Sequence, residues 1–224
     1  MSQYQGHPDQ RWGHITYSQH FDDGMILNLF ELMKIQKPSY IDLGAHSPIT
    51  ISNTKLLYDR GSRGINIEAN PMLIEEFKKY RPEDTNLNIG VAPSPGTMKF
   101  FLYSDTSGRN TFSPKEVESL RGVLTVKREI ILPVTTLPAI VKNYLGGVYP
   151  DFLSCDIEGL DFDVLSQLPG HTDEQDGPKL VCVETRREDT RKMVHMMLGK
   201  SYSLYCRMGE NLFFVRDDYQ QAVY

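Results

Sequence analysis

The chain has 224 residues, 40% of them hydrophobic and 24% charged, with a formal net charge of −5. These fractions are typical of a globular protein, and the negative charge leaves no basic footprint for nucleic acid. No apolar run reaches the roughly 18 residues that a bilayer-spanning helix needs. The first 13 residues are polar, unlike a signal peptide, and the three cysteines lie in apolar runs as buried thiols would. We therefore expect a cytoplasmic protein with no nucleic-acid partner and no membrane span.

Apolar runs with strand character alternate with helical stripes along most of the chain. This alternation predicts an α/β fold with a doubly wound, mostly parallel sheet, and the last two strands are close enough in sequence to form an antiparallel pair. We expect one domain over residues 1–224, with an N-terminal extension over residues 1–24. In chain order, we expect helices over residues 21–34, 52–60, 70–80, 136–145 and 190–198, and a short helix that starts at residue 113. We expect the first two strands to end at residues 42 and 68. The later strands are expected over residues 87–91, 98–103, 128–134, 152–156, 180–184, 201–206 and 212–216.

Two helix starts carry specific local signals. Asn70 precedes Pro71, which suits an N-cap followed by proline at the first helical position. Ser113 precedes Glu116 by three residues, the spacing of a capping box. Both signals predict where the backbone enters a helix.

The first two strands each end at a carboxylate. Asp42 ends the first and is followed by Gly44, and Glu68 ends the second, 26 residues after Asp42. Ligands of doubly wound sheets bind outside the carboxyl ends of the strands, where a glycine turn admits the ligand and an acid can hold a ribose diol. The pattern predicts a nucleoside ligand.

The residues after Gly44 narrow the choice of ligand. A dinucleotide site needs a second and a third glycine to cradle the pyrophosphate, whereas Ala45, His46, Ser47 and Pro48 follow here. A ligand with a ribose but no phosphate needs only the first glycine and the acid. S-adenosylmethionine is such a ligand.

Several segments together resemble the FkbM-type methyltransferases. The similarity covers roughly residues 17–214 and implies the class I methyltransferase (Rossmann-like) fold, S-adenosylmethionine as methyl donor, and O-methylation, commonly of sugar hydroxyls. The segments that carry it, in order, are Asp42-Leu43-Gly44-Ala45-His46-Ser47-Pro48, Ser52-Asn53-Thr54, residues 61–71, Arg81-Pro82-Glu83-Asp84, Asn110-Thr111, Ser154-Cys155-Asp156-Ile157-Glu158-Gly159 and Val181-Cys182-Val183-Glu184-Thr185.

The resemblance also implies roles for residues of the donor site. Gly44 and Ala45 form the turn under the methionine moiety, and Asp42 binds near its amino end. Glu68 takes the ribose hydroxyls, because a carboxylate accepts two hydrogen bonds from a vicinal diol. Asp156 is expected to lie in the same pocket.

Three acids, one of them Asp156, are candidates for the chemistry. Asp156 and Glu158 follow one strand and Glu184 ends the next, so the three carboxylates are expected to converge. Sugar O-methyltransferases of the macrolide and aminocoumarin type carry a similar set, which binds magnesium and supplies the base. We therefore expect Asp156 and Glu184 to hold a divalent cation such as Mg²⁺, for which oxygen ligands are suitable, and Glu158 to take the acceptor's proton.

Each candidate has a structural alternative. Glu158 lies in a strand-to-helix turn, where an acid near a helix N-terminus is stabilised in any protein. His46 is a second candidate base, or a histidine bonded to loop backbone. The loop carrying Arg109 forms either a lid or a polar turn, and Arg186-Arg187 either meets an anionic glycan or starts a solvated helix.

The expected function is O-methylation of a hydroxyl on a sugar or glycoconjugate acceptor. Two rivals remain: a methyltransferase for a small non-sugar metabolite, and a non-catalytic nucleoside-binding member of the fold. The sequence also leaves a homo-oligomer open.

Overall fold

The computed structural model describes residues 16–170 and 176–223, so most of the expected N-terminal extension lies outside the described residues. No helix in these two ranges combines the length and the hydrophobicity of a membrane span. The helices are α1 (Asp22–Leu32), α2 (Lys55–Asp59), α3 (Pro71–Tyr80), α4 (Pro114–Ser119), α5 (Leu137–Leu145), α6 (Asp161–Leu165), α7 (Thr190–Leu198), η2 (Asp217–Tyr219) and α8 (Gln220–Val223). The strands are β1 (Tyr40–Leu43), β2 (Gly64–Ile67), β3 (Thr85–Leu87), β4 (Gly90–Val91), β5 (Gly96–Leu102), β6 (Arg128–Thr135), β7 (Phe152–Cys155), β8 (Leu180–Glu184), β9 (Tyr202–Met208) and β10 (Asn211–Arg216).

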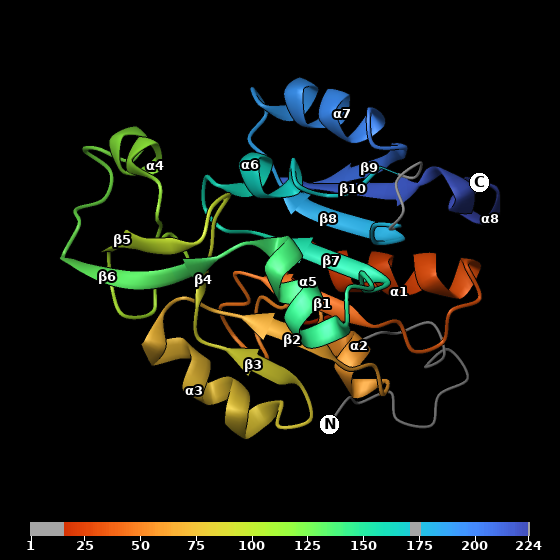
Figure 1. Cartoon of the computed structure of the whole chain (residues 1–224), viewed down its shortest axis with the longest axis horizontal. Coiled ribbons are helices and arrows are strands. Elements are labelled where there is room, and N and C mark those ends of the chain that lie inside the picture. Colours follow the sequence, from red (N-terminus) through yellow and green to blue (C-terminus); the bar gives the residue numbers. More distant parts are fainter. Residues whose placement is uncertain (1–15, 171–175, 224) are drawn as a thin grey trace, which may run out of the picture.

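A seven-stranded sheet in the order β3-β2-β1-β7-β8-β10-β9 forms the centre of the described molecule (Figure 1). β10 runs antiparallel to both β8 and β9, and the other neighbours are parallel. This is the arrangement of a Rossmann-like class I methyltransferase sheet, so the predicted fold class is confirmed, including its antiparallel C-terminal pair.

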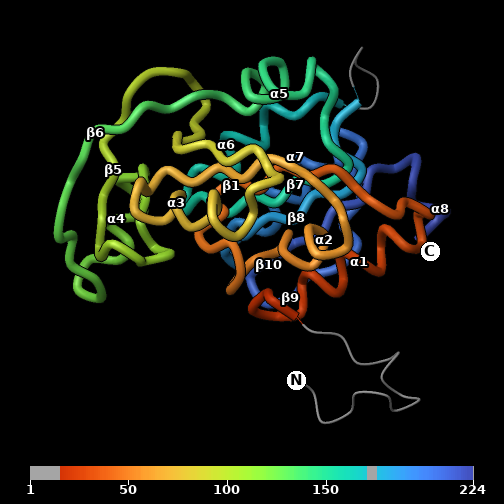
Figure 2. Tube along the Cα trace, turned by 90° about the horizontal axis from the view of Figure 1, so that it is seen from below, coloured from red at the N-terminus to blue at the C-terminus, as the bar shows by residue number. Residues whose placement is uncertain are grey.

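Helices cover both faces of this sheet (Figure 2). One face packs against α5, α6 and α7 through Ile140, Val164 and Met197. The other packs against α1 and α2 through Phe30 and Leu57. Burial on both faces holds the strand ends in place, so the residues just beyond them have a rigid support.

A second sheet corrects the predicted strand over residues 87–91. The segment divides into β3, an edge strand of the large sheet, and β4, which joins β6 and β5 in a separate three-stranded sheet of order β4-β6-β5. The small sheet projects from the carboxyl ends of the large sheet (Figure 1). Its position lets it form a wall of the candidate site.

A row of polar side chains crosses the centre of the large sheet. Asp42 on β1 is in register with Ser154 on β7 and Asn66 on β2, and Asn66 is in register with Asn86 on β3. Parallel strands buried on both faces are normally apolar, so these residues need polar partners. Asn66 donates to Asn86 Oδ1 (2.8 Å) and to Asp84 Oδ2 (2.9 Å).

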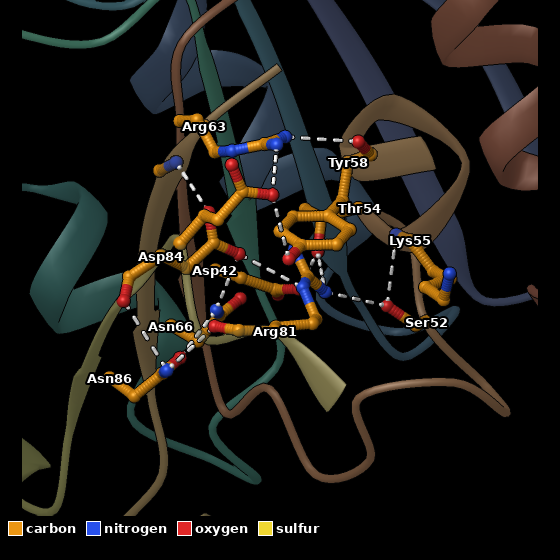
Figure 3. Close-up of polar contacts among 12 residues, drawn as sticks. Asp42, Ser52, Thr54, Lys55, Tyr58, Arg63, Asn66, Arg81, Asp84 and Asn86 are labelled. Atoms are coloured by element: carbon orange, nitrogen blue, oxygen red, sulfur yellow. Dashed lines mark hydrogen bonds and ion pairs between the residues drawn. The ribbon is translucent and has the colours of Figure 1, made fainter. Parts of the chain in front are cut away.

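Arg81 extends this network (Figure 3). Its guanidinium donates to Asp84 Oδ2 (2.9 Å), Thr54 Oγ1 (2.9 Å) and Tyr40 Oη (2.5 Å). Thr54 in turn donates to Asp42 Oδ2 (2.7 Å). The network therefore ties the start of α2 and the end of α3 to β1.

Replacing Arg81 with methionine is expected to lower the free energy of unfolding by about 3–5 kcal/mol, because removing one partner of a buried ion pair leaves the other charge uncompensated. Both Arg81 and Asp84 side chains are 0% exposed. Urea denaturation measures the change. The matched control is Arg60→Met. The ion pair between Arg60 and Glu31 is largely exposed, so its loss should cost at most about 1 kcal/mol. Equal losses of stability in the two variants would contradict the prediction.

Candidate functional site

A cavity of about 390 Å³ opens at the carboxyl ends of β1, β2, β7 and β8; we call it the first cavity. The small sheet contributes Gly90, Val91 and Phe100 to its wall, beside Phe112. Its lining combines apolar side chains with carboxylates. The residues expected from the sequence that line it are Gly44, His46, Glu68, Asp156, Glu158 and Glu184.

Gly44 makes the turn at the end of β1 possible. Its φ is +75°, and a Cβ there would lie 1.8 Å from the backbone oxygen of Asp156. The amides of Gly44 and Ala45 both donate to Ile67 O (3.0 Å each). Because β1 and β7 end so close together, only glycine fits at this position.

Ala45 and Asp42 lie behind the cavity rather than in its wall. Ala45 is 4% exposed and clusters with Ile74 and Phe77. Asp42 is 5% exposed, accepts from Thr54, and burial raises the pKa of its carboxyl. Both residues support the glycine turn from beneath.

Glu68 lies in the cavity wall beyond β2. Its carboxylate accepts from the backbone amides of His46 (2.9 Å) and Asn70 (2.7 Å). Burial raises its pKa, and these two amides act in the opposite direction. Each carboxylate oxygen can accept a further hydrogen bond, so Glu68 combines a fixed orientation with unused acceptor capacity.

Asp156, Glu158 and Glu184 converge as expected, with one carboxylate oxygen from each lying within 4.8 Å of the other two; we call them the acidic cluster. Glu158 is 9% exposed, whereas Asp156 is open to the cavity. Burial first, and then the neighbouring negative charges, raise the pKa of all three carboxyls. The cluster is therefore suited to share a proton or to bind a cation.

The backbone of Glu158 is in the left-handed region, with φ +53°. Thr111 Oγ1 donates to its carbonyl oxygen (2.6 Å), and the amides of Ile157 and Gly159 donate to the Asp161 carboxylate (3.0 and 3.1 Å). The turn-stabilising acid is thus Asp161, while Glu158 faces the cavity. Strain of this kind at a non-glycine residue is often found in functional sites.

Arg109 and Glu210 join the acidic cluster, and sequence reasoning did not assign either to it. The Arg109 guanidinium lies 3.4 Å from Glu158, 3.9 Å from Glu184 and 3.9 Å from Glu210. The charge of Glu158 raises the pKa of Arg109. The only sequence signal was an arginine in a polar loop before the capping box of α4. Arg109 lies close to the acids, and its loop forms part of the cavity wall.

His46 lines the cavity but contacts this loop. Its Nε2 lies 3.1 Å from the backbone oxygen of Thr106, and its φ is +52°. The contact matches the alternative expected for His46, a histidine bonded to loop backbone. The loop is also tied down by Asn70, which donates to Asp105 O (2.8 Å).

Residues 42–204 match the model of the methyltransferase FkbM domain. A solved structure of precorrin-6y C5,15-methyltransferase from Geobacter metallireducens GS-15 is 12% identical over 84% of this chain and 83% of that chain, with a TM-score of 0.38. A search of curated proteins finds no match. Since the domain match covers most of the chain, the protein belongs to the FkbM methyltransferase family.

Proposed function

We propose that this methyltransferase transfers the methyl group of S-adenosylmethionine to a hydroxyl of a sugar or glycoconjugate. One observation carries the proposal: the glycine turn at Gly44, the ribose-type acid Glu68 and the acidic cluster all face a single cavity. The cavity has the size of a small-molecule site. Donor-binding and proton-accepting groups are thus within reach of one bound cofactor.

The donor half fits a nucleoside. Glu68 takes the ribose hydroxyls with its unused acceptor capacity, and the turn at Gly44 lets the end of β1 lie against the Asp156 backbone in the cavity wall. Asp42 supports the turn at Gly44, and through this turn it acts near the amino end of the methionine moiety. The apolar part of the lining, which includes Phe100 and Phe112, is suited to a purine ring.

The acidic cluster performs the acceptor chemistry. Glu158 takes the hydroxyl proton as the acceptor's O–C bond forms, while the donor's C–S bond breaks and its electron pair stays on sulfur. Asp156 and Glu184 would hold a divalent cation, whose charge would relieve their mutual repulsion. Such an ion would lower the pKa of a hydroxyl bound to it. His46 is the alternative base, ranked below Glu158 because its ring contacts Thr106.

Calorimetric binding of S-adenosylhomocysteine, followed by a labelled-methyl screen of sugars and small metabolites, tests the proposal. The wild type should bind the product cofactor, and Glu68→Ala should lose most of that affinity. Transfer to non-sugar metabolites alone would favour the first rival function. Binding without transfer to any acceptor would favour the non-catalytic one, and absence of binding would overturn the proposal.

Exhaustive treatment with EDTA is expected to abolish methyl transfer, with recovery on addition of Mg²⁺. The acidic cluster offers hard oxygen ligands with room for water and substrate. Initial rates with and without the chelator measure the effect, and Glu184→Gln should prevent recovery. Full activity after chelation would leave Asp156 and Glu184 without a metal role.

A further inference from the structure

A second cavity, of about 370 Å³, adjoins the first at the acidic cluster. The two cavities share Arg109, Glu158, Glu184 and Glu210 as lining residues. The other walls of the second cavity come from the starts of α4 and α7 and from α6, which lies between them (Figure 1). The acidic cluster is thus reached from two sides.

The proposed function requires two molecules to meet at one point. The cofactor fills the first cavity, so the acceptor has to reach the acidic cluster from elsewhere. In-line transfer also needs the attacking oxygen opposite the sulfur and close to the methyl carbon. The junction of the cavities, beside Glu158, meets this geometric need.

The charge of the second cavity restricts its ligand. Among the described residues, seven carboxylates and four cationic side chains line it. Three of the four cations are already engaged: Arg109 lies over the acidic cluster, Arg186 binds Glu116 and Ser119, and Lys192 stacks 3.7 Å from the ring centroid of Phe162. The expectation that Arg186 meets an anionic glycan therefore has little support.

Two of the carboxylates remain available to a ligand. Asp163 and Asp189 are exposed and have no ion-pair partner among residues 16–170 and 176–223. Carboxylates accept hydrogen bonds from hydroxyls and attract ammonium groups, whereas a like charge on the ligand is repelled. A polyol without an anionic group suits this lining.

We propose that the second cavity is the acceptor site and that it takes a polyol that is neutral or amine-bearing, rather than a sugar acid or sugar phosphate. The inference rests on the proposed function, because it places the cofactor in the first cavity. It names the substrate class and assigns Asp163 and Asp189 as specificity-determining residues.

Four probes with one carbon skeleton test this preference: glucose, glucosamine, glucuronic acid and glucose 6-phosphate. Their binding to the protein saturated with S-adenosylhomocysteine is measured by saturation-transfer NMR. Glucosamine and glucose should bind, with the two anionic sugars at least about tenfold weaker. The double variant Asp163→Lys/Asp189→Lys should reverse this order while keeping the affinity for S-adenosylhomocysteine within about twofold.

Glu76→Lys is the matched control, because Glu76 is exposed on α3 and lines neither cavity. It should keep the wild-type order. Tighter binding of the anionic sugars to the wild type, no binding of any of the four, or an unchanged order in the double variant would each overturn the inference. A wild type that does not bind S-adenosylhomocysteine would instead overturn the proposed function.

Discussion

Replacing Glu158 with glutamine is expected to slow methyl transfer by about 10²–10⁴-fold, the range that a positioned general base contributes. The amide keeps the shape of the side chain but cannot accept the hydroxyl proton. The affinity for S-adenosylhomocysteine should stay close to that of the wild type, since Gly44 and Glu68 are untouched. Because burial and the charge of Glu184 raise the pKa of Glu158, the neutral variant should unfold at or above the wild-type temperature.

Single-turnover rates and cofactor titrations separate these effects. Glu76→Gln is the matched control, because Glu76 is exposed on α3 and lines neither cavity. It should retain most of the activity. If E158Q transferred methyl groups at the wild-type rate, Glu158 would not be the base, and His46 would be the next residue to test.

Replacing Gly44 with alanine should abolish detectable cofactor binding and destabilise the protein. The new Cβ would lie 1.8 Å from the Asp156 backbone oxygen, so β1 and β7 would have to separate where Asp156 and Glu158 enter the site. Left-handed backbone at a non-glycine residue adds a cost of about 1–2 kcal/mol. Binding of S-adenosylhomocysteine and the urea midpoint measure the two losses.

The control Gly122→Ala separates the effect of the steric clash with Asp156 from the cost of left-handed backbone at alanine. Gly122 has φ +84°, and a Cβ there meets nothing within 4 Å. The control should therefore lose only the stability that the left-handed conformation costs, and keep its cofactor affinity. Similar behaviour of the two variants would mean that the close approach of Gly44 to Asp156 is not what shapes the site.

The predictions that succeeded depend on local chemistry or on simple sheet geometry. Asn70 Oδ1 accepts from the Met72 amide and Ser113 Oγ from the Glu116 amide, as the capping signals predicted. These bonds lie within one helical turn, so neighbouring residues suffice to specify them. The division of residues 87–91 between two sheets depends on distant partners, which local patterning does not reveal.

The same distinction applies to the site. The sequence was enough to predict that acids at the ends of neighbouring parallel strands converge, because such strands end at one edge of the sheet. Only the tertiary structure decided that Asp161 stabilises the turn while Glu158 faces the cavity, and that Arg109 and Glu210 join the acidic cluster. Those two residues come from a loop and a hairpin turn, whose positions depend on long-range packing rather than on periodicity. The second cavity arises in the same way, from the packing of three helix starts that lie far apart in the chain.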